Sequence, residues 1–149
     1  ALDITGPNGV ISGGRIALFG RDDERPQVMQ LIEALPEDRC LDMIGKLNLL
    51  EIYACLQRCV LYVGNDSGLM HIPAASGVPT LGLIGQSREE LYGPWGPNCA
   101  SVRTPESFDS IHPEGFDHIT SGSLMNGLTV KKVSEAIEDI LARCVKATK

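Results

Sequence analysis

The sequence lacks the features that define several classes of protein. No apolar run approaches the roughly 20 residues that a helix needs to cross a bilayer, and no signal-peptide pattern is present at the start. The five cysteines contain no Cys-x-x-Cys pair, which argues against zinc or redox work. The net charge of −6 leaves no basic surface for nucleic acid or an anionic membrane. We therefore expect a soluble, cytoplasmic protein with reduced, mostly buried thiols.

Common signatures of nucleotide binding and nucleophilic catalysis are also missing. The chain has no Gly-x-x-x-x-Gly-Lys-[Ser/Thr] loop and no Gly-x-Gly-x-x-Gly turn. It has no Gly-x-Ser-x-Gly nucleophile elbow either, since residues 64–68 carry the serine one place late. Any affinity for phosphate must therefore come from a local arrangement of another kind.

What is present is an alternation of short apolar runs and amphipathic stretches. The 149 residues suffice for one domain, and the short turns between the runs indicate parallel α/β winding. We expect an irregular segment over residues 1–14, one α/β domain over residues 15–149 and a long surface loop over residues 104–128. The expected strands are 16–19, 40–44, 60–63, 79–85 and 100–103, and the expected helices are 21–35, 49–59, 69–76 and 129–149.

The turn at residues 65–68 (Asn65-Asp66-Ser67-Gly68) joins an expected buried strand to an expected helix. Because the first N–H groups of a helix are unpaired and its dipole is positive there, such a turn can bind an anion. Its Asp or Ser can also simply cap the helix, which is the alternative. The strand ends Phe19-Gly20 and Ile84-Gly85 favour a ligand, since ligands of doubly wound folds collect at the carboxyl ends of strands. We expect these three turns to line one crevice.

Several other residues have both a chemical and an ordinary interpretation. His71, one turn past the cap, can reach a phosphate oxygen or a sugar hydroxyl, or be an ordinary histidine. Trp95 can stack on a base or pin its loop to the domain. Cys55 and Cys59 share one helix face, where core packing explains them. The loop holds a set that only loosely resembles a metal cluster and that solvated loop charges explain better, namely His112 and His118 with Asp109, Glu114 and Asp117.

The motifs around the 65–68 turn resemble the C-terminal half of glycosyltransferase family 9, the ADP-heptose:lipopolysaccharide heptosyltransferases. The similarity runs from about Arg15 to the last helix, and its core is Asn-Asp-Ser-Gly-x-x-His followed by Gly-Val-Pro-Thr. The resemblance implies an α/β fold with a Rossmann-like parallel sheet flanked by helices, one half of a GT-B architecture. The segments that carry it are residues 45–47, 49–51, 63–71, 74–75, 77–80, 85 and 92–96.

The resemblance also implies the chemistry. The C-terminal half of such enzymes holds the nucleotide-sugar donor, and inverting transfer to a lipopolysaccharide core acceptor uses no metal and no cofactor. It implies no nucleic-acid partner and at most peripheral association of the full enzyme with the inner face of the bacterial inner membrane. By position, the resemblance assigns Asn65, Asp66, Ser67, Gly68 and His71 to the donor diphosphate and sugar, Leu47 to the nucleobase and Glu24 to the nucleoside.

This chain departs from the family pattern at several positions. The family's general base is an aspartate of the N-terminal domain, which is absent here, so no catalytic residue is assigned and we expect no transfer by this chain alone. The basic residue of a Lys-x-Trp-Pro-like stretch has no counterpart in residues 1–14. Pro73 replaces the usual alanine and is expected to bend the helix or make its start irregular. Residues 123–126 stand where a Cys-Met-x pattern is common.

Two alternatives remain open from the sequence. One is a related GT-B enzyme such as a UDP-sugar epimerase, which also uses an Asp-Ser-Gly turn at the diphosphate. Those enzymes usually carry glutamates where this chain has Met70-His71. The other alternative is a non-catalytic nucleotide-binding or interaction domain.

Overall fold

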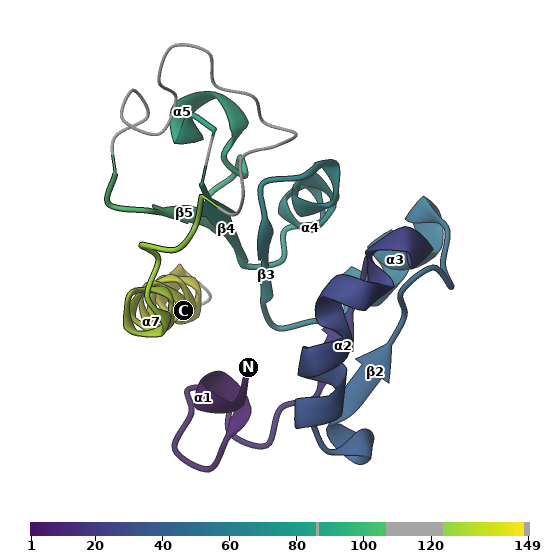
Figure 1. Cartoon of the computed structure of the whole chain (residues 1–149). Helices are drawn as coiled ribbons and strands as arrows, with labels where there is room; N and C mark the ends of the chain where they lie inside the picture. The colour runs from purple at the N-terminus through teal and green to yellow at the C-terminus, as the bar shows by residue number, and fades with distance from the viewer. Residues whose placement is uncertain (86, 107–123, 148–149) are drawn as a thin grey trace. The chain divides into compact units, whose positions relative to one another are not determined.

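A computed structural model describes residues 1–85, 87–106 and 124–147, and these fall into two compact units (Figure 1). The first unit comprises residues 1–55 and the second residues 56–149. Each unit contains its own sheet, of two strands in the first and three in the second. The expected metal-like residues 109–118 and most of the expected 104–128 loop lie outside the described residues.

The first unit is built on one strand-helix-strand motif, as the sequence predicts. Its two strands are parallel, with Ile16 paired to Cys40 and Leu18 to Asp42. Pro26 lies in the first turn of the intervening helix, where its missing N–H costs no hydrogen bond. The elements in order are α1 Leu2–Thr5, β1 Ile16–Leu18, η1 Asp22–Glu24, α2 Arg25–Ala34, η2 Glu37–Arg39, β2 Cys40–Asp42 and α3 Leu49–Leu56.

The second unit is a three-stranded parallel sheet in the order β3-β4-β5. The middle strand β4 is the most buried, with Leu81 and Ile84 inaccessible to solvent. Helix α7 packs against β4 and β5 (Figure 1) and buries Ile137 and Ile140 completely. The elements in order are β3 Tyr62–Asn65, η3 Gly68–Met70, α4 His71–Ala75, β4 Thr80–Ile84, α5 Glu89–Tyr92, β5 Cys99–Arg103 and α7 Val130–Ala147.

Glycine is required at one position of the central strand. A Cβ atom on Gly82 would lie 2.6 Å from Sδ of Met70 and 3.0 Å from Cδ of Pro94. Met70 is itself fully buried. The face of β4 on which Gly82 lies is therefore closed by the segment that follows the 65–68 turn and by the loop after α5.

Some local expectations are corrected and others are confirmed. Helix α3 ends at Leu56 instead of Cys59, and β3 begins at Tyr62. Val60, expected in a buried strand, lies outside β3 and is 62% exposed. All five cysteines are half-buried, not mostly buried, and none of them forms a disulfide bond among the described residues. Thr129 caps α7 as predicted, accepting a hydrogen bond from the Lys132 N–H at 3.2 Å.

Pro73 has the consequence expected of it. The chain passes through the 3₁₀ turn η3 before α4 begins at His71, so the helix starts irregularly. Pro73 is fully buried in the first turn of α4, and its carbonyl accepts hydrogen bonds from Ser76 and Val78. The missing N–H of proline is tolerated there because first-turn N–H groups have no intrahelical partner.

Candidate functional site

The 65–68 turn leaves the carboxyl end of β3 beside β4. The Asp66 N–H donates to the Leu83 carbonyl at 3.2 Å, which extends the β3–β4 pairing by one residue. Ser67 is then extended, with φ −154° and ψ 163°, and the Met70 N–H donates back to its carbonyl at 3.0 Å. The turn is therefore fixed at both of its ends by backbone hydrogen bonds.

The polar groups in the middle of this turn have no partner within the part of the chain that the structure describes. The Ser67 hydroxyl makes no capping bond, and no hydrogen bond or ion pair involves the Asp66 carboxylate. The N–H groups of Ser67, Gly68 and Leu69 likewise donate to no backbone acceptor among the described residues. The alternative in which Asp66 or Ser67 caps the helix is therefore wrong.

The turn is also open to an incoming ligand. Asn65, Ser67 and Gly68 are exposed, and a Cβ atom on Gly68 would meet no other atom within 4 Å. His71, one turn beyond Ser67, is exposed as well. The structure thus brings together five of the predicted donor residues, namely Asn65, Asp66, Ser67, Gly68 and His71, on one accessible stretch of backbone.

Tyr62, at the start of β3, does not share this exposure. Its ring lies over Gly64, where any side chain would collide with it. Burial raises the pKa of its hydroxyl to about 12. Tyr62 is therefore a packing residue and no acid at neutral pH.

Two of the three strand ends expected to form a crevice lie together in the second unit. The Asp66–Leu83 hydrogen bond joins the end of β3 to the end of β4. Next to it, a Cβ atom on Gly85 would approach Cγ of Met125 to 3.0 Å, so the segment before α7 covers that strand end. The third strand end, Phe19-Gly20, belongs to the first unit.

In the first unit, the ends of β1 and β2 meet through two further turns, residues 20–24 and 44–47. The Gly45 N–H donates to the Gly20 carbonyl at 2.9 Å. Gly45 has φ +68°, and a Cβ atom there would lie 2.8 Å from Cβ of Asp22. Only glycine allows this approach and this backbone conformation without strain.

These two turns hold Glu24 and Leu47, the residues assigned to the nucleoside and the base. The Glu24 carboxylate accepts a hydrogen bond from the Arg21 N–H at 2.7 Å and so closes the 20–24 turn. Leu47 is half-buried. No finding tests the ligand contact of either residue, and both assignments stay predictions.

Sequence reasoning missed a third feature of this unit, the ion pair of Arg25 with Asp42. Arg25 Nη1 donates to Oδ2 of Asp42 at 2.7 Å, and Nη2 donates to the Ile44 carbonyl at 2.9 Å. The hydrogen bond from Arg25 to the Asp42 carboxylate, together with the bond from the Ile44 N–H to it, lowers the pKa of Asp42 to about 2, below its ordinary 3.8. Arg25 and Asp42 lie 17 positions apart in the sequence, so only the position of an aspartate shortly before a turn glycine hinted at its role.

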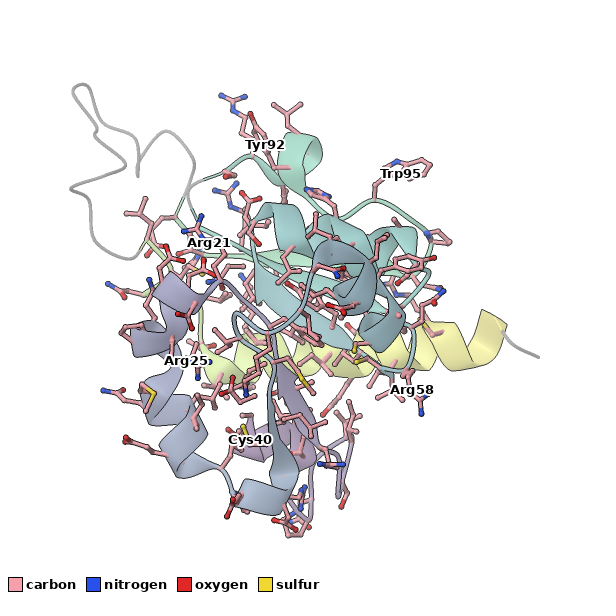
Figure 2. All side chains as sticks on the ribbon, turned by 90° about the vertical axis from the view of Figure 1, so that its right-hand side faces the viewer. Arg21, Arg25, Cys40, Arg58, Tyr92 and Trp95 are labelled. Carbon is pink, nitrogen blue, oxygen red and sulfur yellow. The ribbon has the colours of Figure 1, made fainter. Side chains whose placement is uncertain are left out.

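The loop after α5 carries Trp95, whose side chain extends into the solvent (Figure 2). Trp95 is 89% exposed, so the interpretation in which it pins its loop to the domain is wrong.

Residues 1–85, 87–106 and 124–147 contain no group of three side chains suited to hold a metal ion. Over the same residues, no helix combines the length and the apolar character needed to cross a membrane.

Comparison with known proteins identifies the family. Residues 10–111 match the model of glycosyltransferase family 9 (heptosyltransferase). The chain belongs to glycosyltransferase family 9. Lipooligosaccharide heptosyltransferase 2 of Haemophilus influenzae is 34% identical over 100 residues, which cover 65% of this chain and 29% of that protein. Lipopolysaccharide heptosyltransferase 2 of Salmonella typhimurium is 24% identical over 87% of this chain and 38% of its own length.

Solved structures of the family support the fold. The family 9 glycosyl transferase of Veillonella parvula has a TM-score of 0.73 and 27% identity, covering 87% of this chain and 37% of that one. The Escherichia coli ADP-heptose lipopolysaccharide heptosyltransferase II gives 0.68 at 23% identity, with the same coverage. The prediction of an α/β fold forming one half of a GT-B architecture is confirmed. The chain spans between 29% and 38% of the length of the curated family members it matches.

Proposed function

We propose that this chain is the nucleotide-sugar-binding part of a heptosyltransferase that acts in lipopolysaccharide synthesis. The observation that carries the proposal is the open 65–68 turn, whose carboxylate, hydroxyl and N–H groups have no partner among the described residues. Buried or structural turns satisfy such groups internally. The names of the relatives supply the substrate class, an ADP-heptose donor and a lipopolysaccharide acceptor.

The groups of this turn suit the two chemical parts of such a donor. The free N–H groups of residues 67–69 are donors for diphosphate oxygens, and His71 adds a side-chain donor one turn away. The Asp66 carboxylate repels phosphate but accepts hydrogen bonds from sugar hydroxyls. Donors already in place at the diphosphate stabilise the negative charge that develops when its bond to the sugar breaks.

In an inverting transfer, an acceptor hydroxyl attacks the anomeric carbon while the bond to the diphosphate oxygen breaks and a base takes the hydroxyl proton. We assign no residue of this chain to that base and propose that it lies in the family's N-terminal domain. The proposed transfer uses no metal and no cofactor. We propose that the full enzyme acts at the inner face of the inner membrane, with at most peripheral contact with it. Glycosyl transfer by the 149-residue chain, supplied with ADP-heptose and a lipid A core acceptor, would contradict it.

In the first unit, we propose that Leu47 packs against the base and that Glu24 contacts the nucleoside. The support is their position in two turns that meet at the carboxyl ends of parallel strands, where such folds bind ligands. One Glu24 oxygen is used by the Arg21 N–H. A carboxylate has further lone pairs, so the same side chain retains capacity to accept from a ribose hydroxyl.

Calorimetric titration of the chain with ADP, UDP, GDP and ADP-heptose tests this function. We expect ADP and ADP-heptose to bind, and Asp66→Ala and His71→Ala to weaken ADP-heptose about tenfold or more, the loss of one charge-assisted or directed hydrogen bond. Asp139→Ala, which removes an exposed acid of α7, is the matched control and should bind as wild type.

Each other outcome points to a different function. A preference for UDP favours the epimerase-like alternative, and absence of binding to every nucleotide favours a non-catalytic domain. Wild-type affinity in both site variants overturns the assignment of the 65–68 turn. Thermal unfolding of each variant separates loss of the site from loss of the fold.

A further inference from the structure

Arg25 and Asp42 connect the two turns of the first unit through one continuous set of hydrogen bonds. The two Nη atoms of Arg25 hold the Asp42 carboxylate and the Ile44 carbonyl at 2.7 and 2.9 Å. The other oxygen of Asp42, Oδ1, accepts the Ile44 N–H at 3.1 Å. Both peptide groups of Ile44 are therefore fixed, and the next residue, Gly45, is bonded to Gly20 in the opposite turn.

Lys46 adds a second cation to this cluster without duplicating the role of Arg25. Its Nζ donates to the Asp42 carbonyl at 2.7 Å and lies 3.4 Å from Oδ2. Lys46 is 55% exposed, whereas the side chains of Arg25 and Asp42 are 31% and 26% exposed. Arg25 joins helix α2 to the 44–47 turn by hydrogen bonds, because its planar fork serves two acceptors at once.

The cluster is adjacent to both residues assigned to the nucleoside. Arg25 directly follows Glu24, and Ile44 precedes Leu47 by three positions. We propose that Arg25 and Asp42 are positioning residues that set the spacing of Glu24 and Leu47, and thereby the affinity and base selectivity for the donor nucleoside. This inference rests on the proposed function. It adds to that function a pair of residues that act through the two turns and contact no ligand themselves.

A positioning role differs from a purely structural one in the property that falls when the Arg25–Asp42 pair is removed. Loss of a positioning pair lowers nucleoside affinity, and loss of a structural pair lowers the stability of the fold. A partly exposed ion pair contributes little to folding on its own. The pairing of β1 with β2 and the Gly45–Gly20 bond are made by backbone atoms, so loss of the pair should leave both in place but free Ile44 from α2. Ligand contacts depend on placement within a fraction of an ångström, so the nucleoside should be affected more than the fold.

The test compares Arg25→Lys and Asp42→Asn with the matched control Arg21→Lys. Arg21 lies in the 20–24 turn and pairs with Asp23 at 2.8 Å, but both side chains are mostly exposed and neither bonds to the 44–47 turn. Figure 2 shows Arg21 and Arg25 at the start of α2. The measurements are the affinities for ADP, UDP and inorganic pyrophosphate by calorimetry, with thermal unfolding of each variant.

We expect ADP to bind about tenfold more weakly to Arg25→Lys and to Asp42→Asn. The ratio of ADP to UDP affinity should fall in both, while pyrophosphate binding stays unchanged and Arg21→Lys behaves as wild type. The double variant should be no worse than either single variant, since both break the same contact. General loss of structure would weaken pyrophosphate as well, and loss of structure in the first unit alone would appear in the thermal unfolding of the variant.

Other results overturn the inference in distinguishable ways. If both variants bind ADP as wild type does while Asp66→Ala binds it more weakly, the positioning role is wrong and the proposed function stands. If ADP and pyrophosphate weaken equally, the pair only maintains the fold, and the role is again wrong. If the wild-type chain binds no nucleotide, the proposed function fails and the inference fails with it.

Discussion

The two candidate binding regions differ in how their polar groups are used. In the second unit, the 65–68 turn is held only at its ends, and its central carboxylate, hydroxyl and N–H groups have no partner among the described residues. In the first unit, a backbone hydrogen bond joins the 20–24 turn to the 44–47 turn, and the Arg25 side chain joins the 44–47 turn to α2. The carboxylates of Glu24 and Asp42 accept hydrogen bonds from N–H groups within these turns. Unused polar groups suit a polar ligand such as a diphosphate. Satisfied ones suit a rigid support for an apolar contact such as Leu47 on a base.

Gly45→Ala is the change expected to damage the first unit most. Gly45 has φ +68°, and the new Cβ would lie 2.8 Å from Cβ of Asp22. The left-handed conformation and the collision together should cost about 2 kcal/mol or more of stability. Denaturant unfolding followed by circular dichroism measures the loss. A variant as stable as wild type would show that the two turns are not held as closely as the structure has them.

Removing the carboxylate of Glu24 should have the next largest effect. Its bond to the Arg21 N–H closes the turn before α2, and loss of one such hydrogen bond costs about 1 kcal/mol. Glu24→Ala should therefore be less stable than Glu24→Gln, whose amide oxygen can still accept the bond. The same unfolding experiment checks this, and equal stability of the two variants would mean that the cap is not formed.

Acid should weaken the first unit through Asp42. The Arg25 and Ile44 bonds lower its pKa to about 2 in the folded protein, against an ordinary 3.8. The stabilising contribution is therefore complete above pH 4 and is lost as the pH falls from about 4 to about 2, when the folded carboxylate becomes protonated. Thermal unfolding between pH 5 and pH 2 measures it. Asp42→Asn should flatten this part of the profile, and a parallel profile in the variant would exclude Asp42 as the group.

The sequence predicted elements correctly where a local residue pattern is typical of a single kind of structure. Apolar runs that end in glycine marked β1 and β4, a short strand was predicted at residues 100–103 where β5 lies, and the periodicity of residues 130–144 marked α7 with its Thr129 cap. The 65–68 turn was found because strand, polar turn and helix start are adjacent in sequence. Its missing caps were not foreseen, since capping preference describes an average over many helices and says nothing of one carboxylate.

Long-range features could not be found in the same way. The Arg25–Asp42 pair spans 17 positions, and its bonds depend on how β2 and α2 pack. The exposure of Trp95 also depends on tertiary packing, because the local sequence does not say whether another segment covers its loop. The metal-like residues His112 and His118 lie outside the described residues, so the favoured interpretation, solvated loop charges without a metal, stays a prediction.

Gly68→Ala is the smallest change and the sharpest counterpart of Gly45→Ala. A Cβ atom on Gly68 would meet nothing within 4 Å, and the residue does not need a positive φ, so stability should change by less than about 0.5 kcal/mol. The methyl group would nevertheless add bulk beside the N–H groups of residues 67–69, which are proposed to bind the diphosphate, so affinity for ADP-heptose should fall severalfold. Calorimetry and thermal unfolding on the same sample separate the two effects. If affinity were unchanged at unchanged stability, the ligand would not approach the backbone at Gly68, and the open turn would be a surface feature without a role in donor binding.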